Sequence, residues 1–175
     1  MSSKIYYNPK NIKAMMLSRY ICLLVFSCFV TISQGQVIDD FTLDDLDNQP
    51  LSLSEVQGDK ITVIDFWATW CRPCTKAMPK LNKIFNKYKD EGLAMVGISC
   101  DGPRSISQVP AVANNLDIDY LILKDIDCEV MNDYQYQAFP TLIVLDSDNE
   151  VVYVHEGFSA GDEHEIEDFI VSQLK

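Results

Sequence analysis

The two cysteines of the segment WCRPC, at residues 70–74, are the side chains of this sequence best suited to chemistry. Cys71 and Cys74 are separated by two residues and can close into a disulfide. They follow an apolar run at 61–67, and an amphipathic helix pattern begins at Cys74. The N-terminus of that helix offers unpaired N–H groups and a partial positive charge, which favour a thiolate at Cys71. This combination indicates thiol–disulfide exchange.

The order of the two cysteines suggests a role for each. Cys71 comes first, at the expected exposed lip of the turn, and is predicted to be the attacking thiolate, with a pKa below the free-thiol value of about 8.5. Cys74 falls inside the first helical turn and is predicted to be the buried thiol that resolves the mixed disulfide. The alternatives are a static disulfide or half of a zinc site. Zinc needs a second pair of ligands, and neither His155 nor His164 is spaced as a partner, so we expect no metal and no cofactor.

Three neighbouring residues can tune this dithiol. Arg72 places a cation between the cysteines, which favours the thiolate and makes the disulfide more oxidising, unless the arginine is simply solvated. Pro73 fixes its own φ angle and limits the freedom of the turn. Asp65 lies six residues before Cys71 in an otherwise apolar run. If buried beside the dithiol, its carboxyl group would have a raised pKa and could take the proton of Cys74; the alternative is a carboxylate at a solvated strand end.

The elements that must position these residues follow from the hydrophobic periodicity. Strand patterns alternate with helix patterns, and a hairpin pattern around DSDN at 146–149 comes before the last helix. This order predicts an α/β three-layer sandwich around a mixed sheet, with an N-terminal β-hairpin. The predicted strands are 37–43, 50–53, 61–67, 93–99, 120–123, 141–145 and 151–155, and the predicted helices are 74–89, 105–115, 129–134 and 162–174.

The first 35 residues have a different character from the rest of the chain. Residues 1–19 carry basic side chains and no acidic one, and 20–32 is an apolar run of thirteen residues. A bilayer needs roughly 20 apolar residues, so this pattern predicts a signal peptide at 1–35, followed by one domain at 36–175. The alternatives are an uncleaved membrane tether through 20–32 and a lipoprotein attached through Cys28.

Charge and cysteine content limit the partners of the mature domain. Four of the 14 basic residues lie in the predicted signal peptide, which leaves ten against 26 acidic residues. Such a negative surface argues against nucleic acid or anionic lipid as a partner. Because disulfides form readily outside the cytoplasm, an exported dithiol that acts as a reductant needs an upstream electron-donating thiol protein.

Three motifs resemble those of thioredoxin-fold proteins, and more narrowly those of exported TlpA/ResA-type thiol–disulfide oxidoreductases. They are DFWATWCRPC at 65–74, the strand VGIS at 96–99 that leads to Asp101, and FPT at 139–141. The resemblance covers about residues 37–174 and includes a strand–helix insertion between 93 and Pro140. It implies an exported, periplasmic or otherwise extracytoplasmic enzyme that reduces disulfides of exported proteins.

The resemblance also implies roles for single residues. Asp65 stands where thioredoxins have their proton acceptor, whereas Ala77 stands where several exported members carry a glutamate. Pro140 matches the cis-proline that faces the dithiol and leaves neighbouring backbone free to pair with substrate; the alternative is an ordinary trans proline at a strand start. The substrate-binding residues expected on this basis are Trp70, Arg72, Pro73, Phe139, Pro140 and Thr141.

Two further cysteines, Cys100 and Cys128, each follow a predicted strand. Both are therefore expected at the sheet edge that carries the dithiol. A second disulfide or a relay pair is one possibility, and two buried free thiols are the outcome that we expect.

Two other functions compete with disulfide reduction. A peroxidase of the peroxiredoxin type resembles Thr-x-x-Cys, but here Thr69 stands two residues before Cys71 instead of three. A thioredoxin-like binding module or chaperone would carry the dithiol without using it.

Overall fold

The computed structural model describes residues 35–175. The possible tether at 20–32, and all but the last residue of the predicted signal peptide, lie outside this range. Within it, none of the helices combines the length and the hydrophobicity that a transmembrane span requires.

A seven-stranded mixed sheet forms the centre of the domain, in the order β2-β1-β5-β4-β3-β6-β7. Strands β3, β4 and β5 run parallel, whereas β6, β7 and the β1–β2 hairpin add antiparallel pairs. The strands are β1 (Thr42–Asp45), β2 (Pro50–Ser52), β3 (Ile61–Trp67), β4 (Leu93–Ser99), β5 (Leu121–Lys124), β6 (Thr141–Leu145) and β7 (Val151–Glu156).

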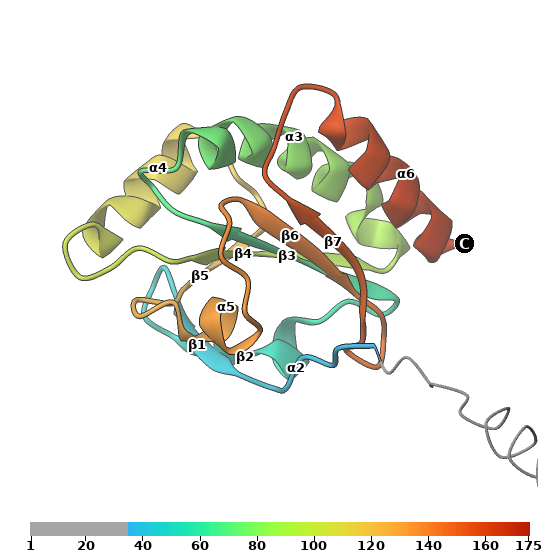
Figure 1. Cartoon of the computed structure of the whole chain (residues 1–175), viewed down its shortest axis with the longest axis horizontal. Helices are drawn as coiled ribbons and strands as arrows, with labels where there is room; N and C mark the ends of the chain where they lie inside the picture. The colour runs from blue at the N-terminus through green and yellow to red at the C-terminus, as the bar shows by residue number, and fades with distance from the viewer. Residues whose placement is uncertain (1–34) are drawn as a thin grey trace, which may run out of the picture. The chain divides into compact units, whose positions relative to one another are not determined.

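Helices cover both faces of this sheet, which confirms the predicted three-layer α/β fold. Figure 1 shows α3, α4 and α6 along one face and the shorter α2 and α5 on the other. The buried residues accordingly form two apolar clusters, one on each side of the sheet. The helices are α2 (Leu53–Val56), α3 (Arg72–Tyr88), α4 (Val109–Asn115), α5 (Glu129–Asp133) and α6 (Asp162–Leu174), with 3-10 turns at Lys89–Glu91 and Ile106–Gln108.

Strand β3 lies between β4 and β6, and all seven of its residues are buried. Side chains alternate between the two faces of a strand. Val63 and Trp67 belong to the apolar cluster under α3, whereas Ile64 and Phe66 belong to the opposite cluster. Asp65 therefore points to the same face as Val63 and Trp67, toward helix α3.

The N-terminal hairpin differs from the sequence prediction at both of its ends. Its first strand begins at Thr42 and not at Val37, which forms only an isolated bridge with Glu150. Its second strand stops at Ser52, because a capping box between Ser52 and Glu55 starts helix α2 there.

Gly97, in the middle of β4, leaves room for the residues around Asp65. A Cβ at this position would lie 2.7 Å from Ile122 Cδ1 and 3.0 Å from Tyr120 Cε2. We therefore expect Gly97→Ala to lower the free energy of unfolding by about 1–3 kcal/mol, the usual cost of overpacking a core. Gly102→Ala is the matched control, because nothing lies within 4 Å of its added Cβ. Urea unfolding of both variants is the measurement, and equal stabilities would contradict this account of the packing.

Candidate active site

The two cysteines of the dithiol lie at the junction between β3 and α3. A turn closed by the bond from Cys71 N–H to the Ala68 carbonyl (3.0 Å) separates the strand from the helix. Cys71 is the N-cap of α3, and its sulfur accepts the N–H of Cys74 at 3.2 Å. Pro73 lies in the first helical turn, where its missing N–H costs no hydrogen bond. The sulfur of Cys71 thus occupies the position at which a helix N-terminus stabilises negative charge.

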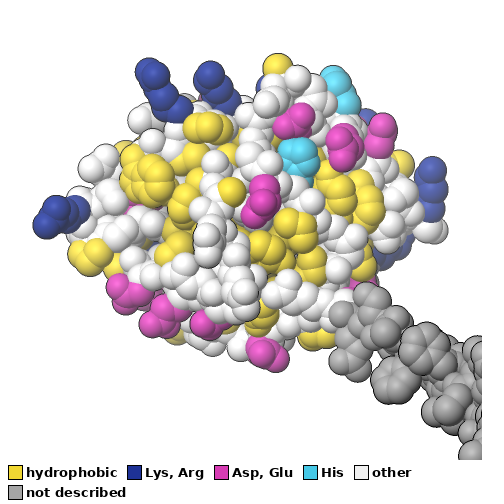
Figure 2. Space-filling model, in the orientation of Figure 1, with side chains coloured by type: hydrophobic (Ala, Val, Ile, Leu, Met, Phe, Trp, Pro, Cys, Tyr) yellow, Lys and Arg dark blue, Asp and Glu magenta, His cyan; other side chains and the backbone are white. Residues whose placement is uncertain are grey.

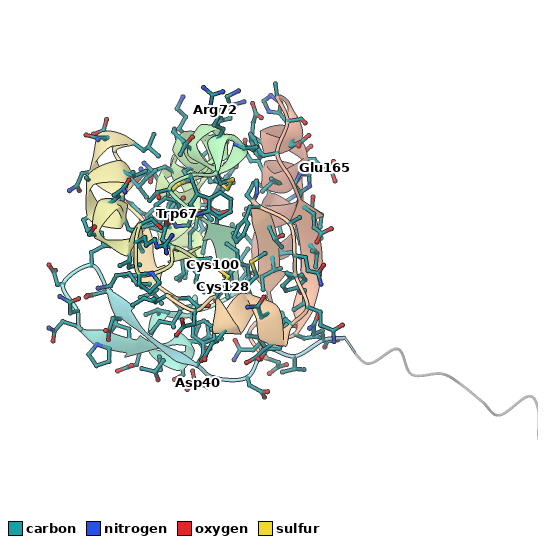
Figure 3. All side chains as sticks on the ribbon, turned by 60° about the vertical axis from the view of Figure 1, so that its left-hand side comes forward. Asp40, Trp67, Arg72, Cys100, Cys128 and Glu165 are labelled. Carbon is teal, nitrogen blue, oxygen red and sulfur yellow. A yellow bond between two sulfur atoms is a disulfide. The ribbon has the colours of Figure 1, made fainter. Side chains whose placement is uncertain are left out.

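Cys71 and Cys74 form a disulfide, with their Cα atoms 5.3 Å apart. Cys71 is 5% exposed and Cys74 is fully buried. The expectation of an exposed lip at Cys71 is therefore wrong in degree, because Trp70, 62% exposed, and Arg72 occupy the outer surface of the turn. Figure 3 shows Arg72 projecting outward from the start of α3. Cys71 is still the more exposed of the two cysteines.

Asp101 holds the turn before Cys71 in place. Its buried carboxylate accepts the N–H and the hydroxyl of Thr69 at 2.8 and 2.6 Å, and the hydroxyl of Ser99 at 2.9 Å. In the sequence, Asp101 marked only the end of a strand motif. The signal for its role was an aspartate two residues after a buried strand; the structure shows that this strand, β4, is parallel and adjacent to β3.

The segment before β6 packs against this turn. The Phe139–Pro140 peptide bond is cis, as the resemblance implied. Phe139 and Trp70 pack edge to face, with ring centroids 5.4 Å apart, so the buried Pro140 lies close to the dithiol turn. Thr141 is buried as well, and its hydroxyl donates to the Ala138 carbonyl at 2.8 Å.

Asp65 is fully buried on the helix α3 side of the sheet. Its Oδ2 accepts the Tyr120 hydroxyl at 3.4 Å, and its Oδ1 has no hydrogen-bond partner. Burial raises the pKa of Asp65 to about 7, and the bond from Tyr120 opposes this shift. Tyr120 belongs to the same apolar cluster as Cys71 and Cys74. Asp65 is therefore not a carboxylate at a solvated strand end, and no pattern in the sequence had indicated Tyr120 as its partner.

Cys100 and Cys128 form a second disulfide, with their Cα atoms 4.8 Å apart. The expectation of two free thiols is wrong, and the alternative of a second disulfide holds. The physical reason is the parallel pairing of β4 with β5, which ends both strands at one edge. A turn from Asp125 to Cys128 then folds back toward Ser99 and brings the two cysteines together. Figure 3 shows Cys100 and Cys128 next to each other.

One group of side chains in residues 35–175 has donors close enough to share a metal ion. The sulfurs of Cys100 and Cys128 and a carboxylate oxygen of Asp125 lie within 4.8 Å of one another. Both sulfurs are bonded to each other in the disulfide. His155, for its part, lies 3.2 Å from a carboxylate oxygen of Asp162.

The fold and the dithiol junction together define a thioredoxin-like oxidoreductase. The chain belongs to the AhpC/TSA family, whose model matches residues 34–154. It is 36% identical over 130 residues to the thioredoxin-like protein YneN of Bacillus subtilis, covering 73% of this chain and 74% of YneN. It is 28% identical over 123 residues to the thiol-disulfide oxidoreductase ResA of Halalkalibacterium halodurans, covering 70% of this chain and 68% of ResA.

A solved structure agrees with these relatives. A protein of Chlorobium tepidum, proposed to be the thiol:disulfide interchange protein DsbE, superimposes with a TM-score of 0.74 at 25% identity, covering 83% of this chain and 100% of that one. The chain is accordingly a thiol–disulfide oxidoreductase.

The buried carboxyl group of Asp65 predicts a pH-dependent stability. The folded protein holds this proton up to about pH 7, whereas the carboxyl group in the unfolded chain loses it near 3.8. Wild-type stability should therefore fall, relative to Asp65→Asn, as the pH rises from about 4 to about 7, and the difference should stay constant above that. The full difference is at most about 4 kcal/mol, at about 1.36 kcal/mol per pH unit.

Urea unfolding of both oxidised proteins across this pH range is the measurement. Tyr120→Phe removes the one hydrogen bond that Asp65 accepts and should extend the fall to higher pH. A stability difference that does not change with pH would refute the assignment of a raised pKa to Asp65.

Proposed function

We propose that this protein is an extracytoplasmic oxidoreductase that reduces disulfides of exported proteins through its Cys71–Cys74 pair. The observation that carries the proposal is the position of Cys71 as the N-cap of α3, with Cys74 buried one turn further along. This arrangement separates an attacking sulfur from a resolving one.

The catalytic cycle begins with the dithiol form. The thiolate of Cys71 attacks one sulfur of the substrate disulfide, and the other substrate sulfur leaves as a thiolate. Cys74 then attacks the Cys71 sulfur of the mixed disulfide, and the second substrate sulfur leaves. Two electrons have passed to the substrate, and Cys71 and Cys74 are joined again. An upstream dithiol protein returns the pair to its reduced form.

Asp65 is the proton acceptor for Cys74 in this proposal. Burial keeps the pKa of its carboxyl group at about 7, so a large fraction is ionised near neutral pH and can take a thiol proton. No glutamate is present at Ala77, and Ala77 is itself buried in the apolar cluster around the dithiol. Proton transfer near Cys74 therefore depends on Asp65.

The substrate is proposed to bind across Trp70 and the Phe139–Pro140 segment. Trp70, Arg72 and Pro73 are exposed, and they surround the cysteine that the substrate must reach. An extended substrate segment can pair with backbone beside Pro140 while its apolar side chains contact Trp70 and Phe139. Figure 2 shows that the side of the molecule seen in Figure 1 exposes hydrophobic side chains below the basic side chains at its top.

The reducing direction has physical support in the surroundings of the two sulfurs. Cys74 is fully buried in an apolar cluster, and a partly ionised Asp65 lies on the same face of the sheet. Both features keep Cys74 a thiol, so the reduced pair gains no stabilisation from a thiolate at this position and stays a better electron donor. The N-terminus of α3 acts in the opposite sense by stabilising the Cys71 thiolate, and so does Arg72, whose exposed charge is screened by solvent.

The location outside the cytoplasm is supported by the sequence pattern of residues 1–35. It is also supported by two disulfides in one domain, because such bonds persist in oxidising compartments. For the N-terminal segment the proposal is a signal peptide at 1–35, with a membrane tether through 20–32 as the alternative.

Trapping of mixed disulfides tests the substrate class. Cys74→Ser removes the resolving sulfur, so Cys71 should stay covalently bound to its substrates. Intact cells that express this variant, quenched with acid and alkylated, should yield mixed disulfides with exported proteins that contain cysteines. Cys71→Ser is the matched control and should trap none of them.

Two outcomes would contradict the proposal. Equal trapping by both variants would mean that the pair does not act in the proposed order. Insulin reduction that survives Cys71→Ser combined with Cys74→Ser would mean that a group other than this pair carries the activity. Binding of unfolded insulin chains by a wild-type protein that reduces no disulfide would favour a binding module or chaperone whose dithiol is incidental.

A further inference from the structure

The Cys100–Cys128 disulfide takes no part in the mechanism above, yet it joins the two segments that shape the active site. On one side, Cys100 donates its N–H to the Trp67 carbonyl at 2.8 Å. The next residue, Asp101, holds Thr69 in the turn that leads to the dithiol. Cys100 is thus fixed to the turn that carries Cys71.

On the other side, the bridge fixes the start of the segment that carries Pro140. Cys128 is the N-cap of α5, and the chain runs from there to Phe139 and Pro140. Cys128 has a left-handed backbone, with φ at 56°, which is uncommon for a residue other than glycine. Such a conformation persists where its surroundings hold it, and here the disulfide and the bond from Cys128 N–H to the Asp125 carbonyl do so.

The surroundings of this disulfide are also suited to exchange. Cys128 is half-buried, whereas Cys100 is 8% exposed, so an external thiolate reaches Cys128 first. A carboxylate oxygen of Asp125 lies within 4.8 Å of both sulfurs. Asp125 is 3% exposed, and burial raises the pKa of its carboxyl group, although it accepts the N–H groups of Glu129 and Val130. Each of the two disulfides within residues 35–175 therefore has a buried aspartate on its side of the sheet.

We propose that Cys100–Cys128 is a second thiol-exchange site, opened by an external dithiol, and that its opening loosens the segment 128–140 that forms the substrate-facing wall. The first part does not depend on the proposed function. The second part rests on it, because it assigns substrate binding to Phe139 and Pro140.

The exchange step is balanced in atoms and electrons. A thiolate of the external dithiol attacks the Cys128 sulfur, the bond between Cys100 and Cys128 breaks, and Cys100 leaves with the electron pair. The protonated fraction of Asp125 supplies a proton to Cys100. The second thiol of the donor then attacks the mixed disulfide, so the donor becomes a disulfide and Cys128 a thiol. Two electrons have moved from the donor to the pair.

The first experiment follows this pair alone. Cys71→Ser combined with Cys74→Ser leaves Cys100–Cys128 as the single disulfide of residues 35–175. The folded protein is equilibrated with reduced and oxidised dithiothreitol, alkylated and weighed. We expect reversible opening without loss of the native circular dichroism. A bond that opens only after a denaturant is added would overturn the proposal and make this disulfide purely structural.

The same assay tests Asp125. Asp125→Asn keeps one of the two oxygens that accept the N–H groups of Glu129 and Val130 but has no acidic proton to supply, and its disulfide should open at least threefold more slowly. Asp127→Asn, an exposed neighbour, is the matched control and should open at the wild-type rate. Equal opening rates in the parent protein and in both variants would show that Asp125 does not supply the proton to Cys100.

The second experiment tests the effect on substrate binding in the protein with an intact Cys71–Cys74 pair. Cys100→Ser combined with Cys128→Ser should raise KM for a peptide disulfide about fivefold or more. The rate of the same variant with a small aromatic disulfide should change less than twofold, because such a substrate does not depend on contacts with the segment 128–140. Asn132→Ala, an exposed change on α5, is the control for general disturbance of this helix.

The outcomes separate the two proposals. An unchanged KM in the serine variant would overturn the coupling to the substrate-facing wall and leave the proposed function intact. If the wild-type protein reduces neither the peptide disulfide nor the small aromatic disulfide, the proposed function itself is refuted.

Discussion

The direct passage from strand β3 into helix α3 is the constraint on which the rest of the site depends. Because β3 is buried on both faces between two other strands, its end is fixed, and the turn after it has little freedom. Cys71 must then cap the helix, and its sulfur receives the N–H of Cys74. The same edge collects the ends of β4 and β5, because parallel strands finish together. Asp101 and the second disulfide lie there for that reason.

This arrangement includes a carboxyl group in the core. Asp65 has one hydrogen bond, from Tyr120, and one oxygen without a partner. An ionised carboxylate in such a place destabilises the fold, and this cost is what keeps the pKa of Asp65 near 7. An apolar residue in place of Asp65 would make the core more stable. Its presence therefore favours a role in proton transfer over a role in packing.

The sequence predicted those features that depend on local patterns. The buried run at 61–67, the helix after it and the strand order along the chain gave the fold, and the spacing of Cys71 and Cys74 located the site. Contacts between distant residues left no pattern to detect. Tyr120 reaches Asp65 from 55 positions away, and Cys100 meets Cys128 only because the turn after β5 folds back. The burial of Cys71 is likewise a property of the folded turn, which spacing alone does not determine.

The reduction potential of the Cys71–Cys74 pair is the measurement that tests the account most directly. Equilibration of the folded protein in redox buffers, followed by alkylation and mass analysis of the peptide that contains both cysteines, separates this pair from Cys100–Cys128. A reductant with a buried, poorly stabilised resolving thiolate should have a potential near that of thioredoxin, about −270 mV. A value near about −120 mV, typical of a strong oxidant, would contradict the proposed direction of electron flow and the part that the surroundings of Cys74 have in setting it.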